Sequence, residues 1–589
     1  MSHISGVFPS PGQSETFHNR QKNPGFFEPS PHSVMATVED ISVILSGQPQ
    51  LKYQPSKSND SNENIHIAHE LAEGFKKDGA DIVKSIEGDF SLAIYNPSDC
   101  TGVIAIDRMG VGDLYYAQIG QNLYFGDLKH ITRNFARGPE INQQALFAYF
   151  YFHMIPAPLS IYEGVNKLLP GQYLLWDGKQ FKLDFYWRPS FTDSHLPESD
   201  LIRNLRTTLK EAVESNVKSP AATGSFLSGG LDSSTISGLY KEISPNEAKA
   251  FSIGFDAEGY DEMAYARSAA KHFNLPIHEY YVTPGDVVKA IPKIAAFYEE
   301  PFGNASAIPA YYCALLAKNQ GVQTLLAGDG GDELFAGNER YAKQKMFALY
   351  DRIPSWLQSI LIEPLVNLDL PVPLLGKLKS YVTQARTPMP ERMETYNFLH
   401  RMPLAEIFEE DYLATVDSGW PIGHLKAVYE TPETDSMLKR MLYLDWKITL
   451  ADNDLRKVNR MCRLAGVDVR YPMLQDPVVS LAAQIPDRLL MRGFELRSFY
   501  RRAFKDFLPS TTLEKRKHGF GLPFGLWLQS DPALQALAND SLNSPHLSGI
   551  VKKSFLQTLK SQHQQSHASY YGVMIWVLMM WAQWAEQHG

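Results

Sequence analysis

The chain has 589 residues, and its 56 lysine and arginine residues against 65 aspartate and glutamate residues give a formal net charge of -9. A composition of 44% hydrophobic and 21% charged residues is that of a globular protein and excludes a mainly disordered or fibrous chain. The acidic balance argues against a nucleic-acid partner, which would call for a basic surplus. At about 150 residues per domain, the length predicts two to four domains.

The three cysteines, Cys100, Cys313 and Cys462, are too few for a disulfide scaffold and too far apart for a metal-binding pair. The first thirty residues lack the apolar core of a signal peptide. We therefore expect a reduced, cytoplasmic protein. The longest apolar run is Val573–Trp581, extended to Ala585 with only Gln583 interrupting; it is shorter than the roughly 20 residues that cross a bilayer. It predicts a buried C-terminal helix, and no membrane contact is expected.

Residues 1 to about 190 are predicted to form mainly strands and turns, because short apolar segments alternate with turn residues. The predicted strands are Gly88–Tyr95, Val103–Ile106 and Leu123–Phe125. A turn at Pro170–Tyr173 is expected to lead into one strand that ends near Trp187. The polar stretch Gln54–Glu63 is predicted to be a loop.

The segment Pro189–Pro197 has the composition of a linker, and the pattern changes after it. Leu201–Val217 has helical periodicity, and short apolar strands then alternate with helices. The predicted strands are Gly224–Leu227, Ala250–Phe255, His278–Val282 and Gln323–Ala327. This alternation implies a parallel sheet with helices on both faces. From about residue 340 onward the pattern is mainly helical.

The strongest chemical signal is the string SGGLDSS at Ser228–Ser234, between a predicted strand and a predicted helix. The two glycines allow a tight turn and a close approach to a ligand. Serine hydroxyls and free N–H groups at a helix start form an anion site. Asp232 would repel a bare phosphate, so a bridging Mg²⁺ is expected. The Walker-type GK[ST] string is absent, which excludes the loop of a kinase or motor ATPase.

A second signal is AGDGGDELFAG at Ala327–Gly337, which follows the predicted strand at Gln323. Ligands of open α/β sheets bind at this edge, so both loops are expected to face one crevice. Three acidic residues among four glycines fit a metal and phosphate site. A plain surface turn is the alternative for either loop alone, because Asp-Gly pairs are common in turns. The two motifs together disfavour it.

With these motifs the chain resembles the asparagine synthetase family, which has a pyrophosphate-loop ATP-binding domain. Further segments fit that family in order: Ser252–Phe255, Asp261–Arg267, Glu300–Phe302, Leu455–Met461 and Lys517–Pro523. The resemblance implies an α/β protein with two domains. Residues 1–188 would form a glutaminase-like α+β sandwich of the Ntn type, and residues 189–200 a linker. Residues 201–589 would form the pyrophosphate-loop ATPase, with a doubly wound parallel sheet and a helical C-terminal part.

In that family a carboxylate attacks the α-phosphate of ATP, pyrophosphate leaves, and an amine then displaces AMP. The resemblance implies these cofactor-binding residues: Leu227, Ser228, Gly229, Gly230, Asp232, Ser233, Ile253 and Gly328. It implies Asp232 and Asp332 as Mg²⁺ ligands, and Lys457 as a pyrophosphate contact. Asp329 stands at an acidic position associated with substrate or intermediate handling. The expected catalytic residues are Asp329, Lys457 and Arg497.

The glutaminase half departs from the family pattern. Ser2 stands where the family has its cysteine nucleophile, and a serine hydroxyl has a far higher pKa than a thiol. The family's glutamine-binding segments have no clear counterpart near Asn23–Gly25 and Ser46–Gln48. The scaffold segments Glu87–Phe90 and Asp107–Tyr116 persist. We therefore expect a retained but inactive glutaminase-like domain.

The synthetase half keeps the nucleotide motifs but changes their surroundings. Arg497 replaces a family lysine; arginine keeps the charge but does not readily release a proton, so it suits pyrophosphate binding better than proton transfer. Asn304 and Asn459 replace two common aspartates. These changes leave ATP use in place and the acceptor substrate open.

Three functions are compatible with this pattern. A lasso-peptide (macrolactam) cyclase would join a peptide N-terminus to an Asp or Glu side chain, and the loss of several glutamine-site segments slightly favours it. An ammonia-dependent asparagine synthetase would use aspartate, and a non-catalytic regulatory pseudoenzyme is the third alternative. β-Lactam synthetases typically carry Tyr at the position of Asp329 and are disfavoured. The cyclase interpretation implies a precursor peptide and a leader-peptide-binding or protease partner. The oligomeric state is open.

Overall fold

The computed structural model describes residues 4–11, 26–52, 63–350, 353–354, 357, 373–515 and 521–589, without the side chains of 373–378. Two antiparallel sheets build the N-terminal half, with strand orders β2-β1-β8-β7-β9 and β11-β10-β6-β5-β4-β3. Their elements are β1 (Ser5–Phe8), β2 (Phe27–Glu28), β3 (Ser33–Val38), β4 (Ile41–Leu51), α2 (Glu63–Asp78), η1 (Gly79–Ser85), β5 (Ile86–Asn96), β6 (Thr101–Ile106), β7 (Tyr115–Ile119), β8 (Asn122–Gly126), α3 (Leu128–Thr132), α4 (Gln143–Phe152), β9 (Asn166–Lys167), β10 (Gln172–Trp176) and β11 (Phe181–Phe185).

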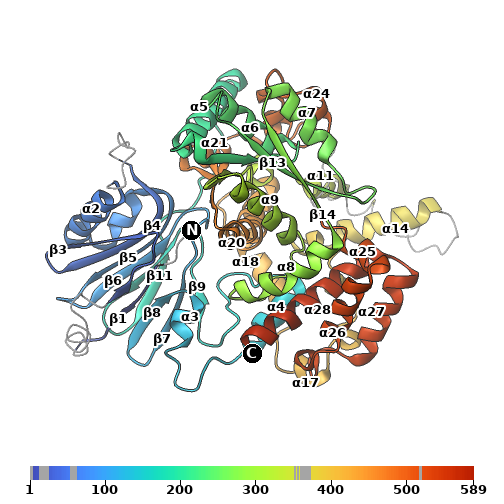
Figure 1. Cartoon of the computed structure of the whole chain (residues 1–589), viewed down its shortest axis with the longest axis horizontal. Coiled ribbons are helices and arrows are strands. Elements are labelled where there is room, and N and C mark those ends of the chain that lie inside the picture. The colour runs from blue at the N-terminus through green and yellow to red at the C-terminus, as the bar shows by residue number, and fades with distance from the viewer. Residues whose placement is uncertain are drawn as a thin grey trace.

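The two sheets form the expected α+β sandwich (Figure 1). The sequence of β5 has a near-continuous apolar run because this strand is buried on both faces. Phe90 and Leu92 pack with α2 in one core, whereas Ala93 and Tyr95 join Phe125 of the facing sheet in another. Side chains on a strand alternate between the two faces, so one strand serves both cores.

The predicted strands at Gly88, Val103 and Leu123 are confirmed as β5, β6 and β8. The single strand predicted to run up to Trp187 is wrong. The segment is the hairpin β10–β11, which turns at Gly178 with a φ of 91°. The predicted loop Gln54–Glu63 lies outside the described residues, apart from Glu63 at the start of α2.

The predicted linker, Pro189–Pro197, has neither helix nor strand and packs on the C-terminal half. The Phe191 ring meets Tyr443 edge-on, and the Ser194 N–H donates to the Gln484 carbonyl at 2.8 Å. The linker is therefore anchored to the domain that follows it.

The C-terminal half contains a fully parallel sheet in the order β14-β13-β12-β15-β16. Its strands are β12 (Thr223–Phe226), β13 (Ala250–Phe255), β14 (Ile277–Val282), β15 (Thr324–Leu326) and β16 (Asp468–Arg470). All four predicted strands are confirmed. The sequence pattern did not predict β16, a three-residue strand embedded in the helical region.

Helices cover both faces of this sheet, as expected of a doubly wound fold (Figure 1). One layer holds α5 (Glu198–Asn216), α6 (Leu231–Ile243) and α7 (Met263–Phe273). The other holds α9 (Ala307–Asn319) and α20 (Leu455–Ala465). Apolar side chains of both layers join those of the strands in one continuous core.

The rest of this half is helical, as predicted. The remaining helices are η2 (Pro220–Ala222), α8 (Pro284–Phe297), α10 (Gly331–Phe335), α11 (Glu339–Phe347), α14 (Pro373–Arg386), η5 (Glu391–Glu394), α15 (Phe398–Arg401), α16 (Leu404–Ile407), α17 (Glu410–Leu413), α18 (Trp420–Glu430), α19 (Met437–Asp445), η6 (Trp446–Asp454), η7 (Pro472–Leu474), α21 (Asp476–Ala483), α22 (Asp487–Leu490), α23 (Ser498–Ala503), α24 (Ser510–Glu514), α25 (Phe524–Ser530), α26 (Pro532–Leu542), η8 (Pro545–Leu547), α27 (Lys553–Gln565) and α28 (Ala568–His588).

The expected C-terminal helix is α28, and its Trp576 and Trp584 are buried in the main core. Among the helices in the described part of the chain, none has the length and apolarity to span a membrane. The segment η6 is a π-helix that runs directly into α20. Such wide turns often occur at functional sites.

Candidate functional site

The two glycine-rich loops leave neighbouring strands at the carboxyl edge of the parallel sheet. From β12 the chain steps to β13 and β14 on one side, and later returns to β15 on the other. Ser225 of β12 pairs with Leu326 of β15, so both loops start at the same level. This is the topological switch point, where open α/β sheets bind their ligands.

Hydrogen bonds between two of its own serines connect the two ends of the first loop. The Ser228 N–H donates to Ser233 Oγ at 3.1 Å, and the two serine hydroxyls lie 3.0 Å apart. Gly229 has a φ of +71°, and a Cβ there would lie 2.3 Å from the Tyr265 carbonyl carbon. Helix α6 follows with Gly230 as its N-cap, so no capping side chain covers its first N–H groups. These N–H groups lie where the sequence predicts an anion site, and that role stays a prediction.

The second loop packs directly on the first. A Cβ on Gly331 would lie 2.0 Å from Asp232 Oδ1, and one on Gly328 would lie 2.8 Å from the Ser233 nitrogen. Glycine is therefore required for the two loops to touch. The close approach places the two loops side by side at this edge of the sheet.

Gly331→Ala is expected to weaken binding of MgATP by about 10–100-fold, because the added methyl group displaces the Asp232 carboxylate and overpacking costs about 1–3 kcal/mol. Isothermal titration of the full chain with MgATP measures this. The matched control is Gly285→Ala in α8, where the nearest atom to the new Cβ is 3.9 Å away. Equal affinities for the two variants would contradict the loop contact.

The two carboxylates that the sequence predicts as metal ligands converge on one arginine. Arg497 Nη1 donates to Asp232 Oδ2 at 2.9 Å and to Asp332 Oδ1 at 2.5 Å, and Nη2 donates to Asp232 Oδ1. The Arg497 side chain is only 3% exposed, and its backbone φ of 58° is left-handed. A Cβ on Gly337 would lie 1.8 Å from Asp332 Oδ1, so this arrangement also depends on a glycine.

This geometry fits a divalent cation. Asp232 and Asp332 present hard oxygen donors close enough to share a single cationic group, and that group here is the guanidinium. Among the described residues, no set of three or more His, Cys, Asp or Glu side chains is placed to hold a metal. Mg²⁺ binds with one or two carboxylates plus phosphate and water oxygens. Asp232 and Asp332 would supply the protein ligands.

Asp329 is part of the second loop, and Lys457 of α20 is close enough to it for their charges to interact. Desolvation raises the pKa of the Asp329 carboxyl to about 6, and the charge of Lys457 opposes this shift. Lys457 Nζ donates to Asp454 Oδ1 at 2.6 Å, across the junction between η6 and α20. Burial lowers the pKa of Lys457, but Asp454 and Asp329 outweigh it and raise the pKa above its ordinary value. Lys457 is therefore a fixed cation beside the loop.

The last two candidates line the same edge of the sheet. Leu227 follows β12 and donates its N–H to the Phe251 carbonyl at 2.9 Å. Ile253 lies on the neighbouring strand β13 and is 5% exposed. The structure therefore gathers the candidate residues around one edge, whereas their roles stay predictions.

The sequence interpretation missed Lys515. Its Nζ donates to the Ser228 carbonyl at 3.1 Å, forms an ion pair with Glu262 at 3.1 Å, and lies 4.8 Å from the centre of the Tyr265 ring. The available signal was its place just before the Lys517–Pro523 motif, whose first four residues lie outside the described residues. Lys515 adds a cation at the first loop.

Comparisons with known proteins show the family of the chain. Residues 204–586 match the family model described as asparagine synthase, and residues 68–187 match the glutamine amidotransferase domain. The chain is similar to glutamine-hydrolyzing asparagine synthetase 1 of Bacillus subtilis (strain 168). The two are 27% identical over 505 residues, which are 85% of this chain and 77% of the relative.

Two further relatives carry provisional names as glutamine-hydrolyzing asparagine synthetases. The Methanocaldococcus jannaschii protein is 30% identical over 331 residues, covering 54% of this chain and 63% of that protein. The Mycobacterium bovis protein is 23% identical over 536 residues, covering 87% and 78%. Fold, site and relatives together define an ATP-dependent carbon–nitrogen ligase. The chain belongs to the asparagine synthase family.

Proposed function

We propose that this ligase uses MgATP to adenylate a carboxylate, releases pyrophosphate, and transfers the acyl group to an amine. The observation that carries the proposal is the convergence of Asp232, Asp332 and Arg497 at the junction of the two loops. Bound Mg²⁺ would neutralise charge on the phosphates. The N–H groups of the first loop bind phosphate oxygens, and Lys457 and Arg497 stabilise the departing pyrophosphate.

We propose the domain division 1–188, 189–200 and 201–589, with ATP chemistry confined to the last part. The two family matches end and begin on either side of the linker, at 187 and 204, which supports this division. The three cysteines are free and buried, which supports a reducing, cytoplasmic setting.

The acceptor is proposed to be an amine already present on the substrate. Ser2 in place of the family's cysteine, and the loss of the glutamine-binding segments, support a glutaminase-like domain that does not release ammonia. The favoured reaction joins the N-terminus of a precursor peptide to an Asp or Glu side chain, with a leader-peptide-binding or protease partner. Ammonia-dependent synthesis of asparagine from aspartate is the second candidate; the relative from Bacillus subtilis is named an asparagine synthetase, but a glutamine-hydrolyzing one.

The test measures pyrophosphate release by the full chain with MgATP and a panel of substrates. Peptides with an internal Asp or Glu and a free N-terminus form one arm, with N-acetylated copies as matched controls. Aspartate with ammonium and aspartate with glutamine form the others. Cyclisation predicts release with the free peptides, and a product lighter than the peptide by one water. Release with aspartate and ammonium alone would establish the second candidate, and a glutamine-dependent rate would overturn the inactive glutaminase.

A further inference from the structure

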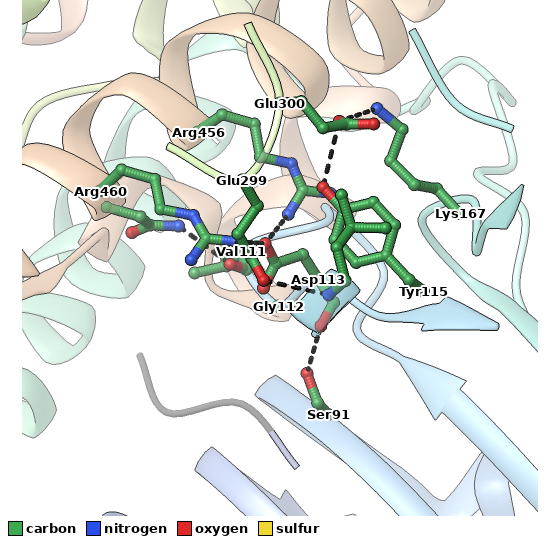
Figure 2. Close-up of polar contacts among 12 residues, drawn as sticks. Ser91, Val111, Gly112, Asp113, Tyr115, Lys167, Glu299, Glu300, Arg456 and Arg460 are labelled. Atoms are coloured by element: carbon green, nitrogen blue, oxygen red, sulfur yellow. Dashed lines mark hydrogen bonds and ion pairs between the residues drawn. The ribbon is translucent and has the colours of Figure 1, made fainter. Parts of the chain in front are cut away.

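Buried ion pairs join the glutaminase-like domain to helix α20 of the synthetase domain (Figure 2). Asp113 Oδ2 lies 2.7 Å from Arg456 Nη1 and 2.8 Å from Arg460 Nη2, and the Asp113 side chain is 14% exposed. Asn459 of the same helix donates to the Val111 carbonyl at 2.9 Å. One face of α20 is thus bound to the segment that contains Val111 and Asp113.

That segment is a rigid support. Asp107 accepts hydrogen bonds from the backbone N–H groups of Met109, Gly110, Val111 and Gly112, at 2.6 to 3.1 Å. The side chain of one residue therefore fixes the loop that ends at Asp113. A loop held in this way presents the Asp113 carboxylate in a set orientation.

Lys457 lies on the neighbouring face of α20. In the sequence it stands between Arg456 and the residues Asn459 and Arg460, all three of which contact the glutaminase-like domain. Lys457 points to Asp454 and is close enough to Asp329 for their charges to interact. The helix enters this region from the π-helix η6, whose wide turns are less regular than those of an α-helix. Contacts outside the helix also orient it: Arg460 Nη2 pairs with Glu299 Oε2 at 2.6 Å as well as with Asp113 at 2.8 Å.

We propose that Asp113 is a positioning residue for Lys457, and that the glutaminase-like domain is retained as a structural part of the synthetase site. This inference rests on the proposed function. The ion pairs of Asp113 with Arg456 and Arg460 fix the rotation of α20 and so hold Lys457 near Asp329 of the second loop. The domain then contributes to ATP chemistry without any glutaminase reaction of its own.

A double-mutant cycle on the full chain tests this, with Mg-pyrophosphate as the probe in isothermal titration. Asp113→Asn and Lys457→Met are each expected to weaken binding by about tenfold, the loss of one charge-assisted contact. The double variant is expected to bind as weakly as Lys457→Met alone, because Asp113 acts through Lys457. Asp113→Glu keeps the charge and is expected to restore most of the affinity.

Asp476→Asn is the matched control. Asp476 is also a buried carboxylate between the domains, and it accepts from Arg108 at 2.6 Å and from the Gly88 N–H at 2.7 Å. The Asp476→Asn variant is expected to have a lower melting temperature, but its dissociation constant for Mg-pyrophosphate should stay within about twofold of wild type. If Asp113→Asn is unstable, Arg456→Met replaces it in the same cycle. This variant removes one of the two ion pairs of Asp113, and the remaining pair with Arg460 keeps the Asp113 carboxylate compensated.

Two results would overturn the inference: normal pyrophosphate binding by a folded Asp113→Asn variant, or effects of the two substitutions that multiply in the double variant. Failure of the wild-type chain to bind both Mg-pyrophosphate and MgATP would instead overturn the proposed function. The two failures are therefore distinguishable.

Discussion

Asp232→Asn is expected to lower the rate of carboxylate-dependent ATP–pyrophosphate exchange by about 10²–10³-fold. The substitution is nearly isosteric but removes one of the two carboxylates that converge on Arg497. A metal that has lost a charged ligand stabilises the transition state less by several kcal/mol, and about 1.4 kcal/mol corresponds to tenfold. The exchange rate is measured with the carboxylate that gives the fastest wild-type reaction.

The control for this prediction is Asp468→Asn. Asp468 lies on β16, at the edge of the same sheet, and its side chain is 47% exposed with Arg470 3.8 Å away. This variant is expected to exchange at the wild-type rate. An unchanged rate in Asp232→Asn at low Mg²⁺ would contradict the assignment of Asp232 as a metal ligand.

Arg497→Met is expected to have opposite effects on metal binding and on catalysis. The Arg497 guanidinium neutralises Asp232 and Asp332, so a divalent cation must compete with a cation that the chain itself supplies. Its removal leaves two adjacent, partly buried carboxylates without their cation. Binding of Mn²⁺ without nucleotide should therefore tighten by at least about tenfold, while pyrophosphate exchange falls.

Electron paramagnetic resonance of free Mn²⁺ measures the binding without nucleotide or substrate. Arg501→Met is the matched control on the same helix, α23, because the bonds to Asp232 and Asp332 come from Arg497. Adding Asp332→Asn to Arg497→Met should abolish the gain in affinity. Equal Mn²⁺ affinity in wild type and Arg497→Met would show that the guanidinium does not compete with the metal.

Arg497 Nε supports a second role for this side chain. The atom is buried and has no hydrogen-bond partner among the described residues, so the guanidinium is not fully satisfied by the two carboxylates. Its bidentate geometry suits a phosphate as well as a carboxylate. With Asp232 and Asp332 occupied by a divalent cation, Arg497 would be available to pair with pyrophosphate.

The two loops were predictable because each is a short string with its strand before it and its helix after it. Ser228–Ser234 and Ala327–Gly337 carry their own glycines, acids and hydroxyls, so local chemistry was enough to predict an anion and metal site. Their meeting in one crevice followed from the rule for parallel sheets. Strand β5 was also predictable, because its buried stretch from Phe90 to Tyr95 is apolar except for Ser91.

Contacts between distant segments were not predictable in this way. Arg497 lies 265 residues from Asp232, and its left-handed backbone has no local signal. Arg460 lies 347 residues from Asp113. The hairpin β10–β11 was predicted as one strand because its turn, which includes Gly178, is short and polar residues continue through β11. Such pairings depend on tertiary packing rather than on propensity.

Carboxylate-dependent exchange of labelled pyrophosphate into ATP tests the adenylation chemistry most directly. The full chain, Mg²⁺ and the substrate panel are incubated with labelled pyrophosphate, and nucleotides are separated by chromatography. Adenylation predicts label in ATP that requires the carboxylate, with AMP as the nucleotide product when the amine is present. Carboxylate-dependent formation of ADP and phosphate, with no label in ATP, would contradict it.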